Sequence, residues 1–372
     1  MTPSLYNLAP AVELMLLGLL LLVLPLAWVW RRHATSSSQQ KRQALLWVTL
    51  FLTFDLVMFG AFTRLTDSGL GCPDWPGCYG AVSPVGAHAE IREAQIQMPT
   101  GPVTFTKAWI EMIHRYLAMM VGGLILVSAA LAWWARARGQ ASTPVGLPSV
   151  TLLWVCVQGA FGALTVTMKL FPLIVTLHLM GGLVLLGLLT WQVQRQRVID
   201  QGHGAASVSP RHWWLVCGGL MLLVVQVALG GWVSTNYAVL ACNTFPQCQG
   251  VWWPEMDFAR GFGLWRPLGH DEQGEVLSFQ ALTAIHYTHR LLAYGVFVYG
   301  GVLAWQLRHV PAWQQALKAW VALLVLQLLT GLSNVVLDWP LLSAVMHTGG
   351  AAALCSVMVW MLAGVRRSPS AP

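Results

Sequence analysis

The run AWIEMIHRYLAMMVGGLILVSAALAWW occupies residues 108–134 and decides the fold class. It exceeds the roughly 20 residues that an α-helix needs to cross a bilayer, yet it carries Glu111, His114 and Arg115 near one end. Ionisable side chains inside a membrane are costly and indicate a functional site. The run therefore predicts a transmembrane helix that carries chemically active groups close to one membrane surface.

The rest of the chain has the same apolar character. Of its 372 residues, 56% are hydrophobic and only 9% are charged, with a mean hydropathy of +0.60. Soluble proteins are about one-quarter charged, so this composition excludes a soluble enzyme, a disordered chain and a nucleic-acid-binding protein. We expect an all-α polytopic protein of the lipid bilayer. The nine predicted spans are 11–30, 44–63, 108–134, 146–168, 173–193, 213–235, 281–306, 316–336 and 340–364.

Basic residues predict the orientation of these spans. More than half of the 21 Lys and Arg residues fall on one side of a nine-span arrangement. They are Arg31, Arg32, Lys41, Arg42, Arg136, Arg138, Arg195, Arg197, Arg211, Arg308, Lys318, Arg366 and Arg367. The positive-inside rule makes this side cytoplasmic. The N-terminus and the loops 64–107 and 236–280 are then periplasmic, and the C-terminus is cytoplasmic, in a bacterial plasma membrane. The first span lacks a basic n-region and a cleavage site, so we expect a retained helix.

An internal repeat divides the chain. The motif Cys-x5-Cys-x-Gly occurs at 72–80 and at 242–250, and His-Arg-x-Leu-Ala occurs at 114–118 and at 289–293. Four further residues recur at one constant spacing: Gln158, Gly162, His178 and Gly181 as Gln327, Gly331, His347 and Gly350. The repeat predicts two similar four-helix bundles related by a pseudo-twofold axis along the membrane normal. We expect an extra helix and linker at 1–42, a first half at 43–200 and a second half at 201–372.

Four histidines lie at one predicted depth. His114, His178, His289 and His347 each follow the outer start of their span by about six to eight residues, or roughly 9–12 Å. Two imidazoles on facing helices form an axial ligand set for haem iron. We expect the first two histidines to pair in the first half, and the last two in the second. Hydrogen bonding between helices is the alternative for any single histidine, and zinc is disfavoured because the pairs lack a suitable third ligand.

The two halves differ at one ionisable position. Glu111 lies one helical turn before the first histidine, and the residue that matches it in the second half is His286. A carboxylate in only one half marks that half as the reactive one, where it can hold or pass a proton; a structural hydrogen bond is the alternative. Arg115 and Arg290 can pair with haem propionates or reach the membrane interface. Asp55 has no acidic counterpart in the second half. A proton route and a contact between helices are the two open alternatives for its role.

Two cysteine pairs lie in the outer loops. The periplasmic side is oxidising, so the pairs Cys72/Cys78 and Cys242/Cys248 can form disulfides. We expect a structural disulfide in the second pair. A redox role is an open alternative for the first pair, because it neighbours the half that carries the glutamate.

The sequence Phe-Thr-Arg-Leu-Thr-Asp-Ser-Gly-Leu at 62–70, joined to the spaced histidines, resembles the haem A synthase family. The resemblance covers about residues 44–364 and implies eight helices in two four-helix halves, so the first span here departs from the pattern. It implies oxidation of a ring methyl of haem O to a formyl group by two successive hydroxylations. The product, haem A, serves terminal oxidases.

The resemblance also implies roles for particular residues and partners. His289, His347 and Arg290 would hold a permanent haem b, and His114, His178 and Arg115 would bind the substrate haem. Glu111 would act beside the methyl group, and Cys72 and Cys78 would support activity. The expected partners are a haem O synthase that delivers the substrate, the terminal oxidase assembly and a second copy of the chain.

Two other functions fit parts of the pattern. A dihaem b-type electron-transfer protein would use both histidine pairs and have no use for the glutamate. A transporter would use the repeat as a translocation path. Clustering of the histidines at one depth argues against the transporter.

Overall fold

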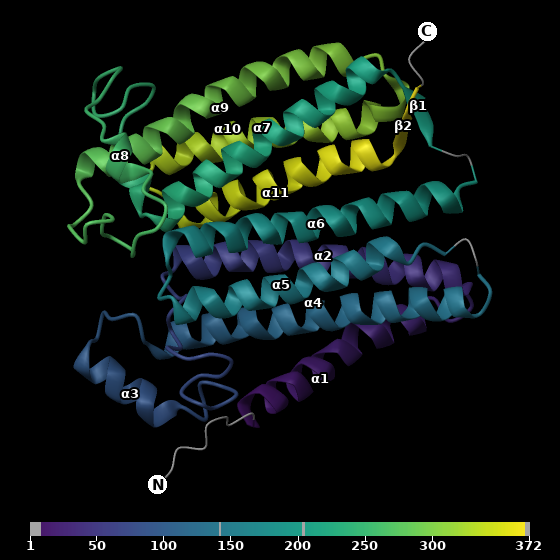
Figure 1. The fold of residues 1–372 in the computed structure, drawn as a ribbon, viewed down its shortest axis with the longest axis horizontal. Helices are drawn as coiled ribbons and strands as arrows, with labels where there is room; N and C mark the ends of the chain where they lie inside the picture. The colour runs from purple at the N-terminus through teal and green to yellow at the C-terminus, as the bar shows by residue number, and fades with distance from the viewer. Residues whose placement is uncertain (1–8, 141–142, 203–204, 369–372) are drawn as a thin grey trace. The chain divides into compact units, whose positions relative to one another are not determined.

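A computed structural model describes residues 9–140, 143–202 and 205–368, so the ends of the predicted terminal segments, 1–8 and 369–372, lie outside the described residues. The regular structure of the described chain is almost entirely α-helical (Figure 1), which confirms the predicted class. The long helices are α1 (Ala9–Arg32), α2 (Ser38–Leu65), α4 (Phe105–Ala137), α5 (Gly146–Thr167), α6 (Pro172–Asp200), α7 (Pro210–Thr235), α9 (Phe279–Leu307), α10 (Gln314–Val336) and α11 (Leu341–Ala363). The short elements are α3 (His88–Gln97), β1 (Ala206–Val208), η1 (Ala238–Leu240), α8 (Phe258–Gly261), η2 (Pro311–Trp313) and β2 (Val365–Arg367).

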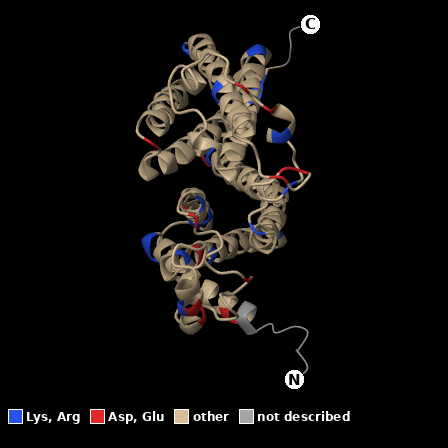
Figure 2. Cartoon of the chain, turned by 90° about the vertical axis from the view of Figure 1, so that its left-hand side faces the viewer, with Lys and Arg blue, Asp and Glu red and all other residues tan. Residues whose placement is uncertain are grey.

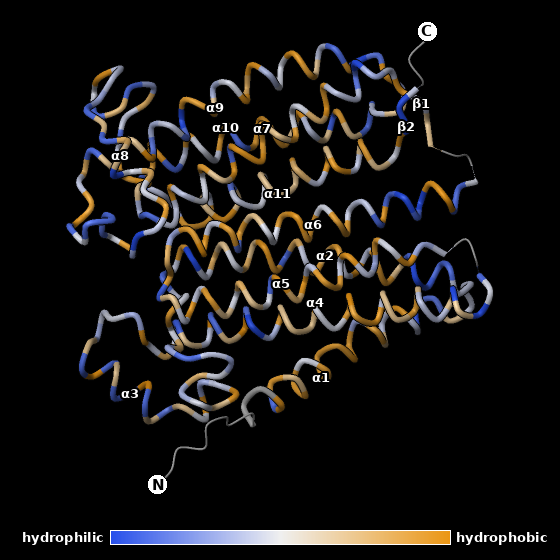
Figure 3. Tube along the Cα trace, viewed as in Figure 1, coloured by the Kyte–Doolittle hydropathy of each residue, from blue (hydrophilic) through white to orange (hydrophobic). Residues whose placement is uncertain are grey.

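Eight of the described helices are long and apolar enough to span a membrane, so the chain is a multi-pass membrane protein. They are α1, α2, α4, α5, α6, α7, α10 and α11. Apolar residues predominate along these helices, and hydrophilic residues are more frequent in the loops (Figure 3). Charged residues are sparse (Figure 2). The prediction of a ninth span at 281–306 is not confirmed. Helix α9 is long enough, at 29 residues, but its first half is rich in polar and ionisable side chains.

Local sequence signals fix where several helices begin. Ser37 and Gln40 form a capping box at α2, in which each side chain accepts a hydrogen bond from the other residue's backbone N–H. Thr104, Ser209 and Ser278 cap α4, α7 and α9 through their hydroxyl oxygens. Caps placed just before apolar runs are the sequence feature that makes these boundaries predictable.

The helices divide by their contacts into two compact units, Met1–Leu170 and Phe171–Pro372. In the first unit, α4 is central and packs against α1, α2 and α5. Close contacts between α1 and α4 occur where Gly18 meets Met119 and Gly123 meets Leu22. The extra N-terminal helix is thus an integral part of this unit.

The second unit contains a four-helix arrangement. Helices α7 and α10 each pack against both α9 and α11, so α9 and α11 face one another across the bundle. Helix α6 packs against α7 and α11, and β1 pairs in parallel with β2 at the end of the unit opposite α8 (Figure 1). The contacts therefore group α6 with the second unit, whereas the repeat groups it with the first half.

Candidate functional site

Two of the predicted ligands meet in the second unit. His289 lies on α9 and His347 on α11, and their imidazoles are close enough to interact electrostatically. Both side chains are half-buried. The helices that carry them face each other across the bundle, which is where cofactors bind in four-helix proteins. The donor set that results, two imidazoles from opposite helices, fits the two axial positions of a haem iron.

One turn of α10 contacts His347 at three points. The Gln327 Nε2 group donates to the His347 carbonyl oxygen over 2.8 Å, and Thr330 Oγ1 lies 2.9 Å from His347 Nδ1. A Cβ atom on Gly331 would lie only 3.1 Å from His347 Cε1. Any larger residue at this glycine would displace the ring.

Helix α7 contacts His289 in a related way. The Gln226 Nε2 group lies 3.1 Å from His289 Nδ1 and donates to the His289 carbonyl oxygen over 3.1 Å. A Cβ atom on Gly230 would lie 3.0 Å from His289 Cε1. Each of the two imidazoles therefore lies against a glycine and beside a polar side chain.

The first unit repeats the glycine contact. A Cβ atom on Gly60 of α2 would lie 3.0 Å from Cε1 of His114 on α4. The His114 ring also lies parallel to that of Phe59, with 6.3 Å between ring centroids. His178 lies on α6, which belongs to the other unit, so its pairing with His114 stays a prediction.

Glu111 connects α4 to the first cysteine loop. Its side chain is buried, at 4% exposure. Oε2 accepts a hydrogen bond from the Cys72 backbone N–H over 2.8 Å, and Oε1 forms a salt bridge with Arg115. The predicted disulfide between Cys72 and Cys78 is present, and both cysteines are buried. The carboxylate thus touches the loop beside the disulfide, one turn away from His114.

Arg115 and Arg290 bind loop carbonyls. Arg115 Nη1 donates to the carbonyl oxygens of Asp74, Pro76 and Gly77. Contact of either guanidinium with haem propionates stays a prediction. Neither the sequence repeat nor the spacing of charges revealed these loop contacts, although the arginine and the Cys-x5-Cys motif do recur together.

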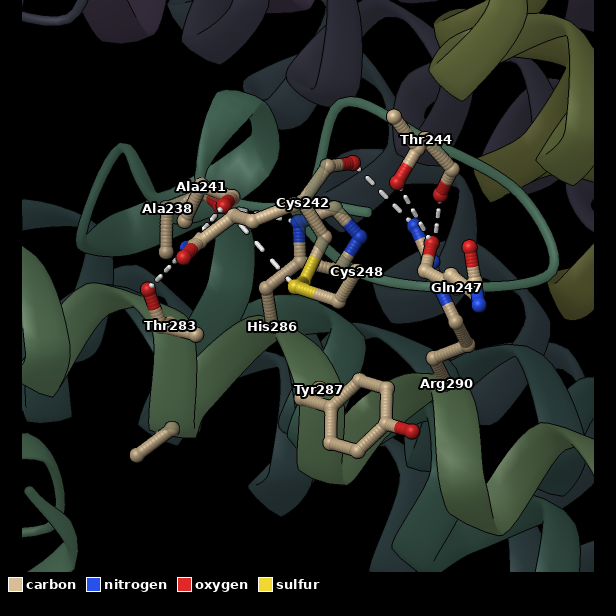
Figure 4. Close-up of a disulfide and its surroundings, with 12 residues drawn as sticks. Ala238, Ala241, Cys242, Thr244, Gln247, Cys248, Thr283, His286, Tyr287 and Arg290 are labelled. Atoms are coloured by element: carbon tan, nitrogen blue, oxygen red, sulfur yellow. Dashed lines mark hydrogen bonds between the residues drawn. A yellow bond between two sulfur atoms is a disulfide. The ribbon is translucent and has the colours of Figure 1, made fainter. Parts of the chain in front are cut away.

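The second cysteine loop is built in the same way (Figure 4). Arg290 Nη1 donates to the carbonyl oxygens of Thr244 over 2.7 Å and Gln247 over 2.9 Å, and Nη2 donates to Cys242 over 3.1 Å. The predicted Cys242–Cys248 disulfide is present.

His286 occupies the position that matches Glu111. Its Nδ1 lies 3.0 Å from the Ala238 carbonyl oxygen, to which only the protonated nitrogen can donate. The side chain is buried, at 5% exposure. The second half therefore has a hydrogen-bond donor where the first half has a carboxylate, and the predicted difference between the halves is seen in their contacts.

The model of the cytochrome oxidase assembly protein family (COX15-CtaA) matches residues 43–359. The chain belongs to this family. A relative named heme A synthase from Shewanella oneidensis is 39% identical over 85% of this chain and 94% of its own length. Relatives of the same name from Caulobacter vibrioides and Nitrosospira multiformis are each 26% identical, over 89% and 87% of this chain and 98% and 92% of their own lengths. The family match begins after α1, in agreement with the expectation that this helix is an addition.

Proposed function

We propose that the chain is a haem A synthase, which oxidises a ring methyl group of haem O to the formyl group of haem A. Relatives that cover most of the chain carry this name, and the family is one of cytochrome oxidase assembly proteins. The observation that carries the proposal is the pair formed by His289 and His347. The helices that carry these imidazoles face each other across the bundle, and each ring lies against a glycine.

His289 and His347 are the residues that would hold haem b. Thr330 Oγ1 lies near Nδ1 of His347, which leaves the other nitrogen of that ring for the metal. The Gln226 amide nitrogen lies 3.1 Å from Nδ1 and 3.5 Å from Nε2 of His289. When bound, haem b supplies one-electron transfer. The protein's part is to fix both rings and to keep them in an apolar bundle.

We assign the substrate haem to His114 and His178 from the repeat. Glu111 lies one turn from the first of these histidines, where its carboxylate can hold or accept a proton beside the reacting methyl group. The Cys72 N–H and Arg115 orient that carboxylate. The disulfide loop would thus support activity by keeping the glutamate in place.

The positive-inside rule supports one orientation. The cysteine loops would face the periplasm, and the ends that carry β1 and β2 would face the cytoplasm. Haem O would then be oxidised near the periplasmic surface, on its way from a haem O synthase to the terminal oxidase. An alkaline phosphatase fusion at Glu255 should be active and one at Ser368 inactive; the reverse pattern would contradict this orientation.

Extraction of haem from membranes tests the proposed reaction. The chain is expressed with a haem O source, and the extracted haems are separated by chromatography. We expect haem A with the wild-type chain and a loss of at least ten-fold in Glu111→Gln, because removing a group that transfers protons typically costs about 10²–10⁴-fold. Glu93→Gln in the exposed helix α3 is the control and should keep the wild-type yield.

A dihaem electron-transfer protein predicts a different outcome. It would yield haem B alone from every variant, with no effect of the Glu111 change. That result would overturn the synthase and leave an electron carrier that uses the same histidines.

A further inference from the structure

Helix α10 presents three residues to His347 from a single face. Gln327, Thr330 and Gly331 are spaced i, i+3 and i+4, so they lie on one side of the helix. Their contacts reach the histidine's carbonyl oxygen, its Nδ1 and its Cε1. Ser343, at the start of α11, donates its hydroxyl to the Thr330 carbonyl oxygen over 3.1 Å. Two hydrogen bonds, from the Gln327 side chain and to the Thr330 carbonyl oxygen, therefore join this turn of α10 to α11. They flank the Thr330 hydroxyl that contacts the imidazole.

The Thr330 hydroxyl selects one tautomer of His347. A hydroxyl has a single hydrogen, and Thr330 Oγ1 lies 2.8 Å from the Leu326 carbonyl oxygen, to which it donates. Oγ1 must then accept the hydrogen bond that joins it to His347 Nδ1 over 2.9 Å. The ring proton is consequently on Nδ1. The lone pair is on Nε2, the nitrogen that is left to bind a metal.

The matching turn of the first half lacks this hydroxyl. By the repeat, Gln158, Phe161 and Gly162 correspond to Gln327, Thr330 and Gly331. A phenyl ring offers no oxygen or nitrogen for a hydrogen bond. In the part of the chain that the structure describes, the buried Nδ1 of His178 has no hydrogen-bond partner. One hydroxyl group thus separates two otherwise matched turns.

We propose that Thr330 is a positioning residue that fixes the ring plane and the proton of His347, and that it distinguishes the site that keeps its haem from its first-half counterpart. The inference rests on the proposed function. A synthase needs one resident haem and one haem that enters as substrate and leaves as product. An anchored ligand suits the resident haem, and a ligand without a hydroxyl partner suits the haem that exchanges.

The test compares Thr330→Val and Thr330→Ser in the purified full-length protein. Two properties of haem b are measured: its midpoint potential, and its rate of transfer to excess apomyoglobin. Loss of a partner at the outer nitrogen of a ligating histidine typically weakens metal binding about 10- to 100-fold. We expect Thr330→Val to lose haem b at least ten-fold faster than wild type. Its potential should rise, because an imidazole that no longer donates from Nδ1 gives less electron density to ferric iron. Thr330→Ser, which keeps the hydroxyl, should retain wild-type values.

Thr190→Val is the matched control. The Thr190 hydroxyl is also buried and also donates to the carbonyl oxygen four residues earlier, Leu186, over 2.8 Å. It lies about three helical turns after His178 on α6. If Thr330→Val does not accumulate, Thr330→Ala removes the same hydroxyl without the branched side chain. A loss rate and potential that match the Thr190→Val control would overturn the role of Thr330 while leaving the synthase intact. A wild-type protein without haem b would overturn the proposed function and this inference together.

Discussion

At the residue scale, the two cysteine loops depend on one arginine each. Arg115 and Arg290 follow predicted haem ligands directly in sequence, yet their guanidinium groups donate to carbonyl oxygens of the loops. From the sequence, both residues were expected to pair with haem propionates or to reach the membrane interface. The sequence did not reveal the partners, because a long side chain can reach several groups from the same backbone position.

Arg290→Gln should loosen the second loop. The arginine is 7% exposed and donates to three carbonyl oxygens, and a shorter neutral side chain leaves some of these acceptors without a partner. Each buried unsatisfied group costs about 1–3 kcal/mol. The Cys242–Cys248 disulfide is buried in wild type. In the variant we expect an added dithiol to reduce it several-fold faster, as measured by labelling of the two released thiols with a maleimide. Arg260→Gln is the control, since Arg260 is half-exposed and its ion pairs with Asp257 and Asp271 contribute little. Equal labelling rates in the two variants would contradict this role of Arg290.

At the element scale, glycines determine how closely helices approach the histidines. Gly60 and Gly230 occupy matching positions in α2 and α7, and a Cβ atom added at either would lie 3.0 Å from Cε1 of a predicted ligand. Hydropathy predicted these helices, since long apolar runs identify spans without knowledge of packing. The span that hydropathy predicted at α9 is not confirmed, because His286, Tyr287 and Arg290 interrupt the apolar pattern there and contact a loop. The contacts of Gln226 and Thr330 with the rings were also not predicted, because single polar residues on apolar helices show no direction in sequence.

Gly230→Ala should disturb the haem b site more than a typical helix substitution. The added methyl group would lie within 3.0 Å of His289 Cε1 and push the ring away from its place. We expect a lower ratio of haem b to protein in the purified variant, measured by the absorbance of the pyridine complex. Gly295→Ala on α9 is the control, because a Cβ atom there meets open space and the gain in helix propensity is the same. The same haem content in both variants would show that the close approach of Gly230 is unimportant.

At the scale of the whole molecule, the sequence repeat accounts for the two similar sites for which we propose different tasks. The cysteine loop, the arginine and the glycine beside a histidine recur in both units. Glu111 occurs only in the first half, and the residue that matches it in the second half is His286. Thr330 occurs only in the second half, and the residue that matches it in the first half is Phe161. The repeat was readable from sequence because its motifs keep their spacing. The boundary between the two compact units, after Leu170, was not readable from the sequence. Contacts between helices depend on side-chain packing rather than on the order of motifs.

This division of tasks predicts different losses for the two histidine sites. His347→Ala removes a ligand of the resident haem, so we expect the purified protein to lack haem b while still accumulating in the membrane fraction. His114→Ala removes a substrate ligand, so haem b should remain at the wild-type level while haem A disappears from the extract. Both variants are measured by the same extraction and chromatography, with membrane protein levels as the control for insertion. A variant His114→Ala that lost haem b as completely as His347→Ala would mean that the two sites depend on one another. The assignment of one resident haem and one substrate haem to separate halves would then fail.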